Sequence, residues 1–134
     1  MTEADKHRAE WVKALESGEY KVAVSKMADI HDTEGGQVIK GHCCLGVATV
    51  EYAKAHGYEV EYFGDGNIAV KAEHYDLISE GSELPFEIRE YYGLSEAECS
   101  DLAAQNDNRS EYPIADIVAY GDIKRGVRQG VDDA

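Results

Sequence analysis

The sequence has no long apolar run, since its uninterrupted apolar stretches are only a few residues long. A helix that crosses a membrane needs about 20 apolar residues, so we predict no membrane span. The first residues, MTEADKHRAEW, mix acidic and basic side chains and contain no apolar core of the kind that a secretory signal needs. We therefore expect a soluble protein that resides in the cytoplasm.

Cysteine is scarce: the chain has three, and two of them, Cys43 and Cys44, are adjacent. Adjacent Cα atoms lie about 3.8 Å apart, which is below the span that a disulfide bridges. Reduced thiols are the simpler interpretation. The pairs of ligands that form a zinc site are also absent, as is the Gly-Lys-Ser/Thr run of a phosphate-binding loop. We expect neither a metal nor a cofactor.

Basic residues are few, because 13 Lys and Arg stand against 27 Asp and Glu and give a net charge of −14. Such a field repels nucleic acid and anionic membranes and favours a cationic partner. One interpretation of the charge is solubility. The other is a surface that imitates DNA or docks on a host protein with a basic surface.

Helical and extended patterns alternate along the 134 residues, which suffice for one domain. We predict a helix over about 3–17 that buries Trp11 and Leu15, a strand at Tyr20–Val24, and a hairpin whose arms, Met27–Ile30 and Gln37–Ile39, flank a Gly-rich turn. A largely buried helix then runs from Cys43 to His56 and ends at Gly57.

The run YEVEYFGDGNIAVKA predicts a second hairpin with a three-residue turn, Gly64–Gly66. In that register Tyr62 faces Ile68, Val60 faces Val70 and Glu59 faces Lys71. From Glu73 onward we predict helix, with segments at Pro85–Tyr92, at Ser95–Gln105 and around Ile114, Ile117 and Val118. The predicted fold is a single α+β domain over residues 1–121, with short antiparallel hairpins packed on four or five helices; residues 122–134 form a polar, frayed tail.

The stretch HCCLGV, residues 42–47, supports two interpretations. A thiol at a helix N-terminus is typical of cysteine hydrolases and transferases. Here Cys43 or Cys44 would be the nucleophile, His74 or His31 the base, and Asn106 or Asp107 the residue that orients the base. The alternative is packing: cysteine behaves as a small apolar residue, and small residues here would let a strand cross the helix end closely. We favour packing, and we interpret Asn106-Asp107 as a helix end that caps the last helix.

Aromatic residues supply the remaining candidates for a binding site. Tyr58, Tyr62 and Trp11 would line a pocket for a small signalling metabolite. Tyr91 and Tyr92 are adjacent on one short helix and point in different directions, so at least one is expected to be an exposed binding anchor.

Several of these stretches resemble an uncharacterised family of small proteins from tailed bacteriophages and prophages. The similar islands occur in the same order over residues 11–118: WVKALESGEY at 11–20, CCLGV at 43–47, Leu-Pro at 84–85, Gly-Leu at 93–94, Asn-Asp at 106–107 and Ile-Ala-Asp at 114–116. At the position of His42 the family tends to show an aromatic residue. The resemblance implies a viral origin and a compact α+β fold, and it assigns no reaction.

Three functions follow as hypotheses. The first, which we prefer, is a small acidic phage accessory protein that binds a host protein with a basic surface. The second is the cysteine-dependent hydrolase or transferase. The third is a module that sequesters a small host metabolite.

Overall fold

The computed structural model describes residues 2–23, 26–107, 112–114 and 117–118. Four helices and two small antiparallel sheets form the α+β fold that was predicted. In chain order the elements are α1 (Glu3–Glu16), β1 (Ala28–Thr33), β2 (Gly36–His42), α2 (Cys44–His56), β3 (Glu59–Tyr62), β4 (Ile68–Lys71), β5 (Asp76–Ser79), α3 (Phe86–Tyr92) and α4 (Glu96–Asp107).

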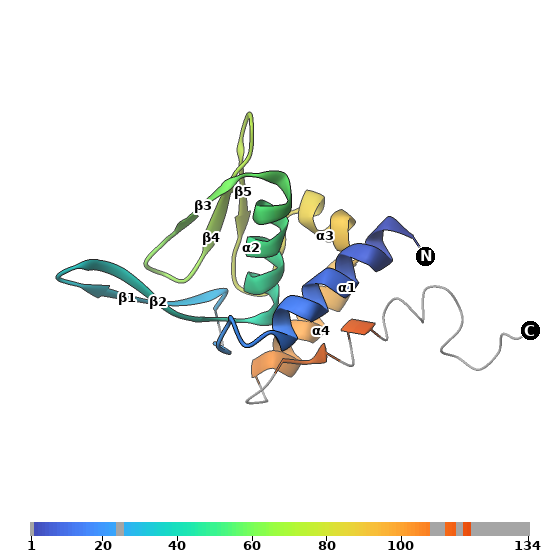
Figure 1. Ribbon diagram of the computed structural model, residues 1–134, viewed down its shortest axis with the longest axis horizontal. Coiled ribbons are helices and arrows are strands. Elements are labelled where there is room, and N and C mark those ends of the chain that lie inside the picture. The colour runs from blue at the N-terminus through green and yellow to red at the C-terminus, as the bar shows by residue number, and fades with distance from the viewer. Residues whose placement is uncertain (1, 24–25, 108–111, 115–116, 119–134) are drawn as a thin grey trace, which may run out of the picture.

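The helix α2 is the centre of the molecule. Nine of its 13 residues are buried, and a helix that is apolar on nearly all sides needs neighbours on all sides. The sheet β3–β4–β5 lies along one side of α2, and α1, α3 and α4 lie on the other (Figure 1). The predicted helix is therefore confirmed, including its end at Gly57, which has the left-handed conformation with φ of 73°.

The hairpin β3–β4 has the predicted register: Tyr62 pairs with Ile68, Val60 with Val70 and Glu59 with Lys71. Gly66 has a φ of 96°, as the three-residue turn requires. Alternate residues of the sheet then face α2, and the Glu59–Lys71 row faces outward.

The prediction of helix from Glu73 onward is wrong at its start. Asp76–Ser79 forms β5, which pairs with β4. Its burial alternates, with Leu77 and Ser79 inside and Asp76 and Ile78 exposed, and the ammonium group of Lys71 lies 2.9 Å from the carboxylate of Asp76 on the outer face. Strand pairing with β4 prevails there because it buries Leu77 against α2.

The hairpin β1–β2 is confirmed and projects from the rest of the domain (Figure 1). The predicted strand at Tyr20–Val24 is wrong for the part that the structure describes, since a single parallel bridge joins Val22 to His42. Lys21 O accepts a hydrogen bond from His42 N at 2.8 Å, and His42 O accepts one from Ala23 N at 3.0 Å. The segment crosses the end of β2 and pairs only at that point.

The predicted helices at 3–17, Pro85–Tyr92 and Ser95–Gln105 correspond to α1, α3 and α4. Ile114, Ile117 and Val118 have helical conformation, as predicted. Residues 115–116 and the predicted tail at 122–134 lie outside the described residues. Among the helices in the described part of the chain, none has both the length and the apolar character that spanning a bilayer requires.

Candidate functional site

The cysteine pair lies at the N-terminus of α2, with Cys43 as its N-cap. The Cys43 sulfur accepts a hydrogen bond from Gly46 N at 3.4 Å, and only 3% of the residue is exposed. Burial raises the pKa of the Cys43 thiol to about 11 and raises that of the Cys44 thiol well above its ordinary value. Both thiols are therefore protonated at neutral pH, although they stand at the positive end of a helix dipole.

Close packing explains why this stretch contains small residues. A Cβ atom at Gly46 would overlap the carbonyl oxygen of Met27. The same oxygen accepts a hydrogen bond from Cys43 N at 3.0 Å, and the two sulfur atoms of Cys43 and Met27 lie 3.9 Å apart. The residue that precedes β1 thus crosses the helix end in contact with its backbone, as the packing interpretation of HCCLGV predicted.

Asn106 fixes the same helix end from α4. Its side-chain oxygen accepts a hydrogen bond from Cys44 N at 3.1 Å, and its amide nitrogen donates one to Ala23 O at 2.7 Å. Asn106 is fully buried. Its side chain therefore caps α2. The predicted helix end at Asn106-Asp107 is confirmed, because α4 ends at Asp107, and the start of the last helix, which the pair was predicted to cap, lies outside the described residues. The contact joins segments 62 and 83 residues apart in the chain, a separation that no local pattern reveals.

The histidines predicted as bases, His74 and His31, are not placed to accept a proton from Cys43 or Cys44. His74 has a side chain that is 80% exposed and lies 3.8 Å from the carboxylate of Glu73, and His31 is exposed and lies 3.2 Å from Asp29. In the described part of the chain, no imidazole hydrogen-bonds the sulfur of Cys43 or Cys44.

His42, the neighbour of Cys43 in sequence, contacts two tyrosines rather than a thiol. Its Nε2 atom lies 2.9 Å from the Tyr62 hydroxyl, and its ring meets that of Tyr20 edge-on. Burial, with a smaller effect of Lys54, lowers the pKa of His42 to about 4. Tyr62 is thereby engaged in the interior face of the sheet.

Cys43 does border a cleft of about 230 Å³, and Asp107 is part of its lining. The other lining residues are Lys26, Gly81, Ser82 and Ala103. A nucleophile there would need a base and a lowered thiol pKa, and this cleft contains no histidine. The arrangement supports packing better than catalysis.

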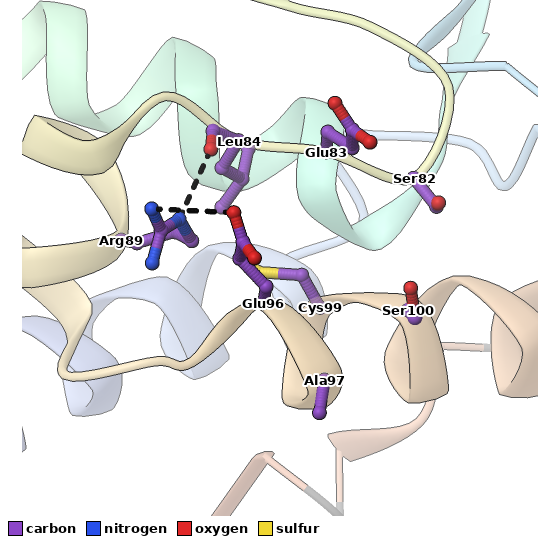
Figure 2. A pocket seen from close by; sticks show the side chains of 8 residues that line it. All are labelled: Ser82, Glu83, Leu84, Arg89, Glu96, Ala97, Cys99 and Ser100. Atoms are coloured by element: carbon purple, nitrogen blue, oxygen red, sulfur yellow. Dashed lines mark hydrogen bonds and ion pairs between the residues drawn. The ribbon is translucent and has the colours of Figure 1, made fainter.

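A second cleft, of about 240 Å³, lies between the segment that precedes α3 and the first turns of α4 (Figure 2). Arg89 and Glu96 point toward one another across it and lie 3.8 Å apart. Arg89 also donates a hydrogen bond to Leu84 O at 3.2 Å. The thiol of Cys99 borders the cleft, and burial raises its pKa to about 11. Arg89 is thus already paired within the cleft, whose second carboxylate is that of Glu83, and the Cys99 thiol is protonated at neutral pH.

Two of the four predicted tyrosines, Tyr58 and Tyr91, belong to one group of stacked and edge-on rings, which we call the aromatic cluster; the buried Tyr92 ring also meets Tyr91 edge-on. The members of the cluster are His7, Tyr52, His56, Tyr58 and Tyr91. The rings of His7 and Tyr91 are stacked with centroids 3.6 Å apart. Tyr52 is buried and the others reach the surface to different degrees. The cluster joins the start of α1, the end of α2 and the end of α3.

Beside the aromatic cluster lies a third cleft, of about 270 Å³, which we call the α1–α3 cleft. Its lining comes from three helices: His7, Glu10 and Trp11 of α1; Glu51, Lys54 and Ala55 of α2; Tyr91 and Tyr92 of α3. Tyr58 and Tyr62 are not among these residues, so this cleft is not the predicted pocket of Trp11, Tyr58 and Tyr62. Tyr92 is no exposed anchor, because it is buried and its hydroxyl donates to Ala48 O at 2.8 Å.

Carboxylates surround the α1–α3 cleft. Burial raises the pKa of the Tyr91 phenol, and the nearby carboxylates of Glu10, Glu3 and Glu51 raise it further. Glu51 is partly buried and accepts a 2.6 Å hydrogen bond from the Tyr20 hydroxyl through Oε2. The effect on Tyr91 reports a negative potential at the aromatic wall of the cleft.

Sequence reasoning missed His7, Glu10, Glu51 and His56. A partial signal existed: His7, Glu10 and Trp11 are spaced at three and four residues, so one face of α1 presents them together. Tyr52 and His56 show the same spacing on α2, and their rings stack. Which helix faces meet is decided by the tertiary fold, and a single sequence does not display it.

Comparison with known proteins gives a family and no function. No curated protein matches the chain. No solved structure matches it either. The family described as domain of unknown function DUF8296 matches residues 3–122, which include every helix and strand of the fold. The chain therefore belongs to the DUF8296 family.

Proposed function

We propose that the protein acts by binding, and that its partner is a protein with a basic surface. The observation that carries this proposal is the net charge of −14, together with its position on the surface. Among the described acidic residues only Asp5 is buried, so the negative charge faces solvent, where it attracts cationic surfaces.

The state of the thiols supports binding over the cysteine-dependent reaction. Cys43, Cys44 and Cys99 are all buried and unbridged. Burial keeps each of them protonated, and the histidines once considered as bases lie exposed beside acidic neighbours. A nucleophilic cysteine needs the opposite environment, with a base in reach and a stabilised thiolate.

The resemblance to small phage proteins extends the proposal. We infer an accessory protein that acts in the cytoplasm of an infected bacterium on a host protein, such as a defence or nucleic-acid-handling protein. Three free cysteines suit a reducing compartment. The acidic surface suits competition with nucleic acid for a basic site, and it disfavours direct contact with nucleic acid.

The proposal is tested in two steps. Cross-linking in bacterial lysate, followed by mass spectrometry, first identifies the partners. Each partner is then purified, and its affinity for the protein is measured by calorimetry from 50 to 500 mM NaCl. We expect basic partners whose affinity falls steadily with salt, because the screening length shrinks from about 10 Å at 0.1 M to about 3 Å at 1 M. Partners that are not basic, or affinities that do not change with salt, would contradict the proposal.

A further inference from the structure

We propose that the α1–α3 cleft is the contact site for the basic partner and that it receives an arginine side chain of that partner. The inference rests on the proposed function and adds to it a place and a side-chain type. Three features of the cleft carry it: its aromatic wall, its carboxylates and its size.

The aromatic wall consists of Trp11, Tyr91 and Tyr92. Trp11 and Tyr92 are buried and pack with ring centroids 5.0 Å apart. Tyr91 is half-buried, and its ring is held between His7, stacked on it, and Tyr52, which meets it edge-on. Trp11 and Tyr92 thus form the buried base of the wall, and Tyr91 is the ring of the three that a guanidinium group can reach. A ring fixed by such contacts needs little ordering when the cation approaches, and aromatic rings attract cations.

Two carboxylates of the lining have free acceptor capacity toward a cation. Both hydrogen bonds of Glu51 use Oε2, which leaves Oε1 without a partner in the described part of the chain. Within the described residues Glu10 is paired only with Lys13, through Oε2 at 3.6 Å, and both side chains are more than two-thirds exposed. An exposed pair of this kind exchanges readily for another cation.

The cleft contains one cation of its own, Lys54, whose charge is already engaged. Its ammonium group donates to the Tyr20 hydroxyl at 3.1 Å and to Glu51 Oε2 at 3.5 Å. It also lies over the Tyr20 ring, 5.4 Å from the centroid. Lys54 thus turns toward Tyr20 and pairs with Glu51, while Glu10 pairs with Lys13, which is not part of the lining and is the exposed cation that an incoming arginine would replace.

The volume of the α1–α3 cleft suits a single side chain of the partner, and the charged residues of the other two clefts make them less suitable for an arginine. The volume of about 270 Å³ lies below the roughly 300–1,000 Å³ of pockets for drug-sized ligands. The cleft of Figure 2 already holds Arg89 opposite Glu96, and the lining of the cleft beside Cys43 includes Lys26 and Asp107 and no aromatic ring among the described residues. Among these three, only the α1–α3 cleft combines rings with carboxylates that lack a full set of partners.

Arginine suits the site better than lysine. A guanidinium group stacks on a ring while it donates in its own plane to carboxylates, whereas an ammonium group is a strongly hydrated point charge. The probes are three hexapeptides, each with two glycines at either end and two identical central residues. The central residues are arginine in the first peptide, lysine in the second and citrulline, which has the shape of arginine without its charge, in the third. Binding to the full chain is followed by NMR shifts and by calorimetry at 50 mM NaCl.

We expect the arginine peptide to bind at least threefold more tightly than the lysine peptide and at least tenfold more tightly than the citrulline peptide, with shifts at Tyr91, Glu51 and Glu10. The variant Glu10→Gln/Glu51→Gln should weaken the arginine peptide at least fivefold. Gln at 51 keeps an oxygen for Tyr20, and Glu10 is exposed, so the fold is preserved. Tyr91→Leu should abolish the preference for arginine over lysine.

The matched control is Glu59→Gln/Glu61→Gln on the outer face of the sheet, which removes the same charge at two residues that do not line the cleft. It should weaken the arginine peptide by less than twofold. Equal losses in both double variants, or shifts that map elsewhere, would overturn the cleft as the site while leaving a salt-dependent interaction with the basic partner intact. If no basic partner binds in a salt-dependent way, the proposed function itself fails.

Discussion

The carbonyl oxygen of Met27 occupies the place where a side chain at Gly46 would begin. Because the residue at position 46, in the first turn of α2, is a glycine without a side chain, the chain just before β1 can lie directly on the helix. The carbonyl of Met27 then accepts the hydrogen bond of Cys43 N. Trp11 reaches the same turn from α1, where its indole N–H donates to Cys44 O at 3.0 Å. The N-terminus of α2 is thus the point at which four separate segments of the chain are joined.

Substitution of Gly46 by alanine should destabilise the fold severely. The new Cβ meets backbone rather than the end of a flexible side chain, so the crossing segment itself must move. We expect a loss of at least about 3 kcal/mol in the free energy of unfolding, at the upper end of overpacking effects, measured by urea denaturation. Gly64→Ala is the control, since nothing lies near its Cβ position, and it should stay within about 1 kcal/mol. Similar stability of the two variants would contradict the close crossing.

The sequence reveals those parts of the structure that depend on neighbours in the chain. The register of β3 and β4 follows from a three-residue turn and from pairing rules within 15 residues, so it is predicted correctly. The capping box of α1, with Asp5 N donating to Thr2 Oγ1 at 3.1 Å, is equally local. Segments whose conformation depends on distant partners are missed. Asp76–Ser79 is a strand because β4 lies beside it.

The candidate site shows the same division. At least one of Tyr91 and Tyr92 was expected to be an exposed anchor, because adjacent residues of a helix point in different directions, and Tyr91 is the one that reaches the surface. Its neighbours in the cleft come from α1 and α2, and their approach depends on the packing of three helices. The role of Asn106 is likewise invisible locally, because its two partners lie in other elements.

Asn106→Leu should lower the free energy of unfolding by about 2–5 kcal/mol, since each buried backbone group left without a partner costs about 1–3 kcal/mol. The groups are Cys44 N, which lies in the first turn of α2 and has no partner within the helix, and Ala23 O. Ser100→Ala, an exposed change on the same helix α4, is the control and should have an effect below about 0.5 kcal/mol. A loss of similar size for both variants would show that the side-chain amide does not cap α2.

Alkylation of the native protein should be slow. With the pKa of Cys43 raised to about 11, roughly one molecule in a thousand carries the thiolate at pH 8, compared with about one in four for a free thiol. We expect iodoacetamide labelling, followed by intact mass, to lag far behind that of the urea-unfolded chain and to accelerate about tenfold per pH unit below pH 10. Labelling of Cys43 or Cys44 at pH 7 as fast as in the unfolded chain would revive the nucleophile hypothesis.

His42 should make stability depend on pH. Folding lowers the pKa of its imidazole from the ordinary value of 6.5 to about 4, so the unfolded chain holds the proton more tightly. The stability that neutral His42 contributes is complete above pH 6.5 and is lost as the pH falls toward 4. A difference of this size corresponds to about 3–4 kcal/mol. Urea denaturation at intervals from pH 7.5 to 4 measures it.

The carboxylates also titrate toward the acidic end of this range, so the change must be read as a difference from a variant. His42→Phe keeps an aromatic ring beside Tyr20, removes the titrating group and gives up the bond to the Tyr62 hydroxyl. The variant should be less stable than the wild type at pH 7.5, and the gap should close by about 3 kcal/mol as the pH falls to 4. A gap that stays constant across this range would mean that the imidazole keeps its ordinary pKa in the folded protein and is not desolvated by its packing.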